Sequence, residues 1–271
     1  MSKYKLNPLN IGAEVFGLDL SKQVSTETKE IIKKDVSQHR ILVFRNQQNI
    51  SPERHVEIGQ WFGEIESTFY NHPKSPLRDI FRVSNDRTEG CTNVGRTGWH
   101  IDGSFQRAPF SHSLYHIISV PQDGTTSFAP LTDIIETLSP ERRDLWERLW
   151  MVSEHQSGPV HPLIYRHPET NKPVLCFHLG MTEGFIMDYG TEKERECSTI
   201  ENMEILQQIK EEILRKPERI YHHQYKDGDF IISDNLAVGH EASPETQLPV
   251  SQIGLRVMHR VTVAGKTSPK K

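Results

Sequence analysis

Residues 228–235 read GDFIISDN, and His240 follows them a short distance along the chain. The apolar run of Phe230, Ile231 and Ile232 lies between a glycine and a Ser-Asp-Asn cluster, a pattern typical of a short strand that ends in a turn. Other short alternating or apolar segments between turn residues lie at 11–20, 40–45, 80–84, 113–120, 174–178 and 254–263. The sequence therefore predicts a mainly β protein.

Amphipathic patterns and start signals predict helices at 26–36, 51–62, 139–149 and 202–215. Ser25 or Thr26 can cap the first, and Ser-Pro pairs open the second and the third. These helices are expected to cover the sheets or to be inserted between strands. No repeat and no long linker interrupts the chain, which predicts one domain over 1–271, with helical insertions near 139–150 and 202–216 and a short basic tail at 266–271.

Composition restricts the possible partners. The chain of 271 residues is 35% hydrophobic and 25% charged, a composition that argues against disorder. Its net charge of -4 gives no positive field that would attract nucleic acid or an acidic membrane. The three cysteines form no CxxC pair, and no stretch reaches the roughly 18 apolar residues of a membrane span. We therefore expect a cytoplasmic protein with a small-molecule partner; a homo-oligomer stays open.

The segment Trp99-His100-Ile101-Asp102-Gly103 places an imidazole and a carboxylate one residue apart. On an extended strand, side chains at i and i+2 point to the same face, so both groups can bind one metal ion. The imidazole supplies nitrogen and the carboxylate supplies a hard, charge-compensating oxygen. A hydrogen-bonded pair at the surface is the alternative reading of this short motif.

His240 is the candidate for a third ligand. Two histidines and one carboxylate on one face of an octahedron leave positions open for a bidentate keto acid and O2, which suits a non-haem Fe(II) oxygenase. Because the chain has fourteen histidines, a polar loop role for His240 remains the alternative.

Alternation along 256–263 places Arg256, Met258 and Arg260 on one face of a strand, and His259 on the other. Two arginines that project into one cavity can form bidentate, charge-assisted contacts with carboxylate or sulfonate oxygens. A pair of exposed strand arginines is the alternative.

Taken together, these motifs resemble the taurine dioxygenase (TauD/TfdA) family of Fe(II)/2-oxoglutarate oxygenases, and the resemblance extends over nearly the whole chain. The blocks that carry it are IGAEVFGLDLS at 11–21, ILVFRNQ at 41–47, WFGEI at 61–65, WHIDGSF at 99–105, DGTTSF at 123–128, VHPLIYRHPETNKPVL at 160–175, GDFIISDN at 228–235 and RVMHRVTVAG at 256–265. The resemblance implies a double-stranded β-helix, or jelly-roll, core of the cupin type.

The same resemblance implies roles for individual residues. His100, Asp102 and His240 would bind Fe(II), while Thr126 and Arg256 would bind the distal carboxylate of 2-oxoglutarate. Thr125 is an alternative to Thr126, because the block at 123–128 departs from the usual family pattern.

On the substrate side, the resemblance implies that Arg260 faces an anionic group, with His72 and Arg96 as further contacts. No arginine follows Asn235 at the position common in the family, so the substrate cannot be named. Loops at 70–76 and 178–189 are expected to form pocket walls, and a loop with Pro244 and Pro249 should absorb the long gap between His240 and Arg256.

The implied activity is oxidation, most simply hydroxylation, of a small sulfonate or carboxylate with release of succinate and CO2. Desaturation or oxidative rearrangement of a natural product is the alternative within this enzyme class. A metal-binding jelly-roll protein without activity, or a zinc hydrolase with the same ligands, is the alternative from another class.

Overall fold

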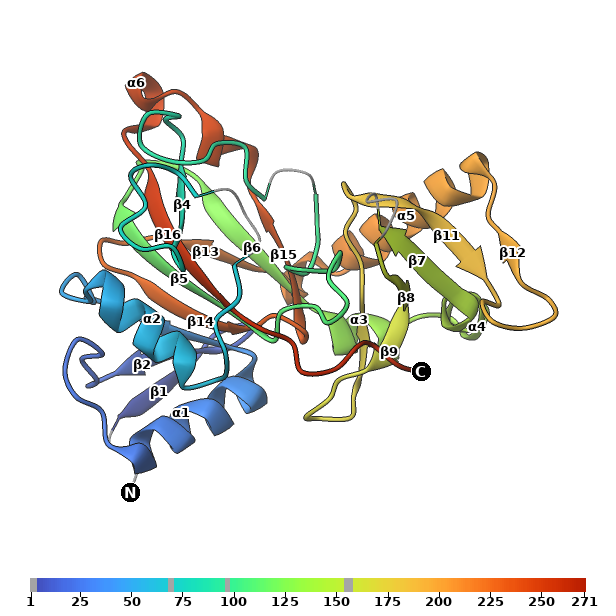
Figure 1. Cartoon of the computed structure of the whole chain (residues 1–271), viewed down its shortest axis with the longest axis horizontal. Coiled ribbons are helices and arrows are strands. Elements are labelled where there is room, and N and C mark those ends of the chain that lie inside the picture. The colour runs from blue at the N-terminus through green and yellow to red at the C-terminus, as the bar shows by residue number, and fades with distance from the viewer. Residues whose placement is uncertain (1–3, 68–70, 96–97, 154–157) are drawn as a thin grey trace.

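Two facing β-sheets form the centre of the structure, a computed structural model in which residues 4–67, 71–95, 98–153 and 158–271 are described. Every strand pairing in the two sheets is antiparallel except that of β2 with β3. The larger sheet has the order β1-β2-β3-β14-β5-β16-β4, and the smaller has the order β13-β6-β15 (Figure 1). Their strands are β1 (Lys5–Pro8), β2 (Ala13–Phe16), β3 (Ile41–Phe44), β4 (Phe81–Ser84), β5 (His112–Ser119), β6 (Thr125–Pro130), β13 (Tyr221–Gln224), β14 (Phe230–Asp234), β15 (Val238–Ala242) and β16 (Val257–Val263).

Strand alternation in the larger sheet divides the surrounding apolar core into two layers, one on each face of the sheet. On β14, Phe230 and Ile232 belong to the apolar cluster that includes residues of helices α1 (Thr26–His39) and α2 (Pro52–Gln60). Ile231, between them, packs with Tyr115 and Phe128 in the cluster between the two sheets. Because the side-chain period is two, a register shift of one residue would exchange the two layers, so the apolar pattern fixes the pairing of the strands.

Local capping explains where the two covering helices begin. The Ser25 side chain accepts a hydrogen bond from the backbone N–H of Thr28, and the Ser51 side chain accepts one from that of Arg54. Ile32 and Val36, one helical turn apart, are fully buried against the sheet. α1 runs slightly further than the predicted 26–36, and α2 ends slightly before the end of the predicted 51–62.

A second lobe lies beside the two sheets (Figure 1). It has a four-stranded sheet of order β12-β11-β7-β8, a hairpin of β9 and β10, and an apolar core that includes Trp146, Phe185 and Ile209. Its elements are α3 (Leu131–Glu136), α4 (Pro140–Arg148), β7 (Leu149–Ser153), β8 (Val160–Pro162), β9 (Ile164–Arg166), β10 (Pro173–Leu175), β11 (Thr182–Met187), β12 (Arg195–Glu196) and α5 (Thr199–Leu214). The predicted helices near 139–149 and 202–215 are therefore α4 and α5, while one domain over the whole chain stays a prediction.

The segments around the site differ in part from the sequence-based expectation. His240 lies within a strand, β15, which excludes the alternative of a loop histidine, and β11 occupies half of the expected loop at 178–189. The long gap before Arg256 contains the 3-10 helix η2 (Pro244–Gln247) and the short helix α6 (Val250–Ile253), and another 3-10 helix, η1 (Pro217–Arg219), precedes β13. Sequences such as VGHEA have weak alternation, so neighbouring strands rather than local preference make them β.

Within the described ranges, no helix has both the length and the apolar character needed to cross a bilayer.

Burial of Ile232 on the covered face of the sheet should stabilise the fold strongly. We expect Ile232→Ala to lower the free energy of unfolding by about 2 to 5 kcal/mol, because the substitution removes buried methyl groups and leaves a cavity. Ile118→Ala, in the neighbouring strand β5, is the matched control: Ile118 is 41% exposed, and the change should be within about 0.5 kcal/mol. Urea denaturation measures both, and equal effects would contradict the assignment of the covered face.

Candidate active site

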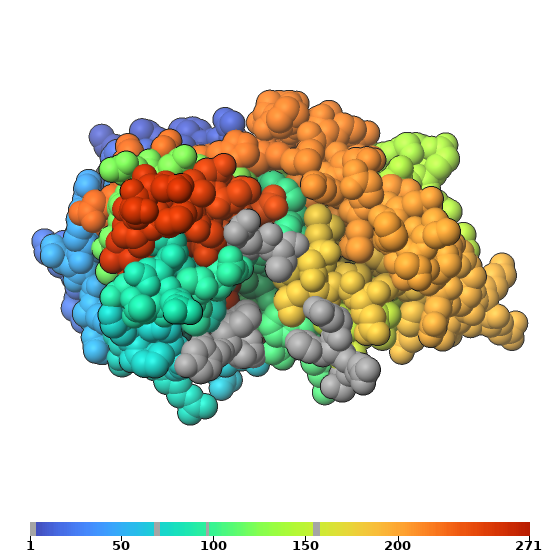
Figure 2. Space-filling model, turned by 90° about the horizontal axis from the view of Figure 1, so that it is seen from above, coloured from blue at the N-terminus to red at the C-terminus, as the bar shows by residue number. Residues whose placement is uncertain are grey.

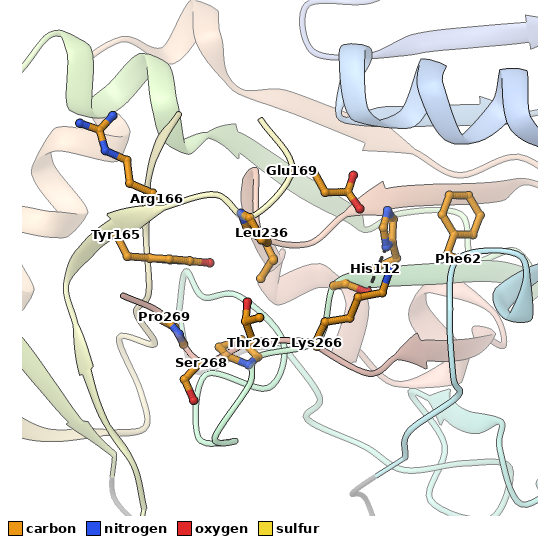
Figure 3. Close-up of a pocket in the computed structure, with 14 residues that line it drawn as sticks. Phe62, His112, Tyr165, Arg166, Glu169, Leu236, Lys266, Thr267, Ser268 and Pro269 are labelled. Carbon is orange, nitrogen blue, oxygen red and sulfur yellow. Dashed lines mark hydrogen bonds between the residues drawn. The ribbon is translucent and has the colours of Figure 1, made fainter. Parts of the chain in front are cut away.

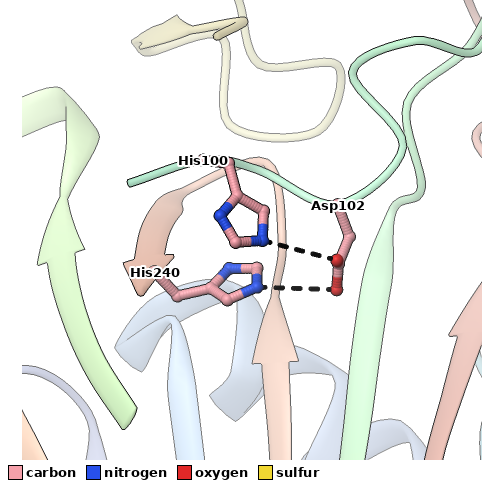
Figure 4. Close-up of side chains that lie close together, drawn as sticks. All are labelled: His100, Asp102 and His240. Carbon is pink, nitrogen blue, oxygen red and sulfur yellow. Dashed lines mark ion pairs between the residues drawn. The ribbon is translucent and has the colours of Figure 1, made fainter. Parts of the chain in front are cut away.

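Three buried ligand atoms converge where the segment before β5 meets β15 (Figure 4). The backbones of His100 and His240 pair as an isolated bridge, with reciprocal N–H···O distances of 3.0 and 2.8 Å. The Nε2 atom of His100 lies 3.9 Å from Oδ1 of Asp102, and that of His240 lies 3.7 Å from Oδ2. One donor atom from each residue lies within 4.8 Å of the other two. The fold therefore brings together the three residues that the sequence proposes as ligands.

The spacing of this triad fits a metal ion. With bonds of roughly 2 Å, two ligands of one ion can be at most about 4 Å apart, and both nitrogen–oxygen distances fall below that limit. The Nδ1 atom of His100 lies 2.7 Å from the carbonyl oxygen of Gly98, so an Nδ1–H donated to this oxygen leaves the Nε2 lone pair for a metal. The ring is thus held in the orientation and tautomer that a metal ligand needs.

The electrostatic environment gives the triad the protonation state that metal binding requires. Burial, together with the nearby charge of His100, lowers the pKa of His240 to about 3, and burial lowers the pKa of His100 too. Burial alone would raise the pKa of Asp102, but the charges of Arg260, His240 and His100 hold it below its ordinary value. Two neutral imidazoles and an ionised carboxylate therefore face one another near neutral pH.

Side chains from the larger sheet fix the Asp102 carboxylate. Nη1 of Arg260 donates to Oδ1 at 2.7 Å, and the Ser113 hydroxyl donates to Oδ2 at 2.7 Å. The Tyr115 hydroxyl lies 3.4 Å both from Oδ2 and from Nε2 of His240. Arg260, which the sequence assigns to a substrate anion, thus contacts a proposed metal ligand and also lines the adjoining cavity.

Asn235, at the end of the GDFIISDN block, fixes the backbone of Asp102. Its Oδ1 accepts the Asp102 N–H at 2.8 Å, and its Nδ2 donates to the carbonyls of Asp102 and Phe110 at 2.9 and 2.7 Å. Gly103 follows with φ of 74°, where a Cβ would lie 2.8 Å from the Phe110 ring. Asp102 therefore lies in a turn rather than in a regular strand, and Asn235 replaces the missing strand hydrogen bonds.

A cavity of about 190 Å³ adjoins the triad. Its lining combines segments of the first lobe with His178 and Met181, which belong to the chain that enters the second lobe. Figure 2 shows the face of the molecule on which the yellow and orange segments of the second lobe meet the teal and red segments of the first. His178, which the sequence analysis missed, stacks on His100 with ring centroids 4.5 Å apart.

A second polar cluster lies between the sheets, around Arg256. This guanidinium is 1% exposed, and its Nε and Nη1 atoms have no hydrogen-bond partner among the described residues. Nη2 lies 3.7 Å from the sulfur of Met258, a weak acceptor. The hydroxyls of Thr126 and Tyr225 are 2.8 Å apart, and the latter also lies 3.7 Å from the Met258 sulfur. A buried cation without an anionic partner is unfavourable, so the chemistry of this cluster fits a bound carboxylate.

Strand geometry distinguishes the two candidate threonines. Thr126 is buried and pairs across the smaller sheet with Ala242, two residues after His240. Thr125 is less buried and alternates to the other face of β6. Its backbone N–H donates to the Oγ atom of Ser243 at 3.0 Å. Thr126 is thus the threonine whose hydroxyl lies in the Arg256 cluster.

The remaining predicted contacts lie elsewhere. The His72 ring bonds the carbonyl of Arg87 at 3.1 Å and accepts the Lys74 N–H at 3.1 Å, and His72 is absent from the described lining of the triad cavity. Arg96 lies outside the described residues. The histidines not proposed as ligands have other partners: His161 with Gln106, His167 with Asp234, His222 with Ser127, His223 with Asp229 and His259 with Arg82.

Figure 3 shows a separate cavity of about 200 Å³. It is lined by residues that include Phe62, His112, Tyr165 and Lys266, and among the described residues none lines both this cavity and the one at the triad.

Comparison with known proteins decides the family. Residues 3–262 match the model of the taurine catabolism dioxygenase TauD, TfdA family. The chain belongs to this family. The family assignment and the jelly-roll core expected from the sequence are confirmed, and so is the enzyme class, a dioxygenase that uses Fe(II), 2-oxoglutarate and O2.

Proteins with sequences similar to this chain act on different small molecules. The chain is 24% identical to the α-ketoglutarate-dependent sulfate ester dioxygenase of Pseudomonas putida, over 94% of this chain and 87% of the relative. It is 24% identical to the α-ketoglutarate-dependent 2,4-dichlorophenoxyacetate dioxygenase of a Burkholderia species, over 87% and 86%. The crystal structure of a taurine dioxygenase from Burkholderia xenovorans has the same fold, with a TM-score of 0.79, 24% identity, and coverage of 98% and 91%.

Loss of the Asn235 side chain should weaken metal binding without removing any ligand. We expect Asn235→Ala to lower the affinity for Mn(II) or Fe(II) about 10- to 100-fold, because the Asp102 backbone loses two hydrogen bonds and its link to the Phe110 carbonyl is lost as well. Anaerobic metal titration, with circular dichroism to verify folding, measures the effect. Unchanged affinity would show that the turn holds Asp102 without Asn235.

Proposed function

We propose that this dioxygenase hydroxylates a small organic anion, such as a sulfonate or carboxylate, at the cavity beside His100, Asp102 and His240. In this proposal the three residues bind Fe(II), and Thr126 and Arg256 bind the distal carboxylate of 2-oxoglutarate. The observation that carries it is the pair of buried arginines in and just before β16, Arg260 beside Asp102 and Arg256 in the Thr126 cluster.

The two arginines suit two different anions. Arg260 lies within β16, and Arg256 directly precedes this strand, with its Nη2 atom 3.7 Å from the sulfur of Met258. Arg256 is paired with no carboxylate among the described side chains, which supports a role in binding the co-substrate. Arg260 reaches both the Asp102 carboxylate and the cavity, which supports a role in orienting an anionic substrate next to the metal ligands.

Bound iron, 2-oxoglutarate and O2 supply the oxidising chemistry, and succinate and CO2 are released. The protein contributes position and a dry site: Phe81, Phe105 and Met181 line the cavity and limit access of water. Asp102 keeps a carboxylate at the position that related halogenases fill with a small residue, which supports hydroxylation. The sulfate ester and phenoxyacetate in the names of the relatives are both anions, and they support an anionic substrate here.

Iron binding by the triad has a spectroscopic test. Addition of Fe(II) and 2-oxoglutarate without oxygen should give a weak visible charge-transfer band in the wild-type protein and none in His100→Ala, which removes one of the three ligands. His39→Ala, at the end of the covering helix α1, is the control and should keep the band. Survival of the band in His100→Ala would remove this residue from the ligand set.

Arg260 should determine the preference for anions. A panel of small sulfonates, sulfate esters and carboxylates should include compounds that raise succinate release above the rate without substrate, whereas neutral analogues should not. Arg260→Lys keeps the charge but loses the planar fork, so we expect KM for an active anion to rise about 10-fold or more.

Mass spectrometry of the product distinguishes the two reactions of this enzyme class. Hydroxylation adds one oxygen, and desaturation removes two hydrogens.

For the panel of compounds, equal stimulation of succinate release by neutral and anionic compounds would contradict the assignment of Arg260.

A further inference from the structure

Tyr225 is the residue of the Arg256 cluster that neither the sequence motifs nor the comparisons assign. It lies just after β13, is 6% exposed, and packs in the apolar cluster between the two sheets. Its hydroxyl is 2.8 Å from the hydroxyl of Thr126 and 3.7 Å from the sulfur of Met258. The phenol therefore reaches the same small volume as the threonine and the arginine.

We propose that the Tyr225 hydroxyl is a third hydrogen-bond donor to the distal carboxylate of 2-oxoglutarate, beside Thr126 and Arg256. This inference rests on the proposed function, since it requires that the carboxylate binds at Arg256. It adds a positioning residue that helps the enzyme to select a dicarboxylic keto acid over one without the second carboxylate.

The hydrogen-bond inventory of the cluster favours this role. Two hydroxyls carry two protons, and the bond between them uses only one. As a donor, the Tyr225 hydroxyl also points to the Met258 thioether at 3.7 Å, which is a weak acceptor. An ionised carboxylate has about four acceptor positions. These are enough for the hydroxyl protons of Thr126 and Tyr225 and for the two nitrogens of Arg256, Nε and Nη1, that have no partner among the described residues.

Neighbouring side chains hold the phenol ring in place. The ring packs edge-on against His223, with centroids 4.7 Å apart. Nε2 of His223 lies 2.9 Å from the Asp229 carboxylate, and its Nδ1 lies 2.8 Å from the Tyr221 hydroxyl. Arg45 pairs with Asp229 at 2.5 Å. A donor on so constrained a ring loses little conformational entropy when a ligand binds.

Burial also keeps the proton on the phenol. It raises the pKa of Tyr225, in spite of the opposing charge of Arg256, so the hydroxyl remains a donor at neutral pH.

The test is Tyr225→Phe, which removes only the hydroxyl. Calorimetric titration of 2-oxoglutarate into the Mn(II)-loaded full-length protein measures binding without turnover. We expect Kd to rise about 10- to 100-fold, as for loss of a hydrogen bond to a charged group. The Kd of 2-oxobutyrate, which has the keto acid but not the distal carboxylate, should change less than about 2-fold. Metal affinity should be unchanged.

Tyr189→Phe is the control, because it removes the hydroxyl of a tyrosine that is 40% exposed and packs on Trp150 in the second lobe, away from the Arg256 cluster. It should bind 2-oxoglutarate as the wild type does. Equal affinity of Tyr225→Phe and wild type for 2-oxoglutarate would overturn the inference and leave the proposed function intact. An equal loss for 2-oxoglutarate and 2-oxobutyrate would also overturn it. Failure of the wild-type protein to bind 2-oxoglutarate would overturn the proposed function itself.

Discussion

The buried carboxylate of Asp102 is the group on which the geometry of the site depends. A charge that is 3% exposed persists only with compensating partners, and here Arg260 and Ser113 donate to its two oxygens. These partners come from β16 and β5, while Asn235 at the end of β14 holds the backbone. Three neighbouring strands of one sheet therefore determine where the carboxylate lies.

The pairing of His100 with His240 sets the other half of the triad. The reciprocal backbone hydrogen bonds of these two residues place their rings 4.3 Å apart, and His178 stacks on the outer side of His100. Because the rings are positioned through main-chain contacts, the fold itself sets the geometry of the three proposed ligands. Such pre-organisation would lower the cost of binding a metal ion.

β16 connects the two polar clusters of the interior. Met258 and Arg260 lie within it and Arg256 directly precedes it, so one short segment supplies the cation near Thr126 and the cation near Asp102. The outward residues Val261 and Val263 belong to the apolar layer under the covering helices. The strand that packs in the core therefore also sets the separation of the Arg256 and Arg260 charges. A substitution that shifts this strand would change both the packing of the core and the geometry of the site.

The sequence by itself determined the mainly β class, the His-x-Asp pair and the two-arginine strand, because alternation and residue spacing are local properties. It also pointed to His240 among fourteen histidines, through its place after the GDFIISDN block. Only the tertiary structure decided that β15 carries His240, that Arg260 contacts Asp102, and that Tyr225 and His178 lie at these clusters. Those contacts join residues distant along the chain, and the pairing of strands that creates them leaves no local pattern in the sequence.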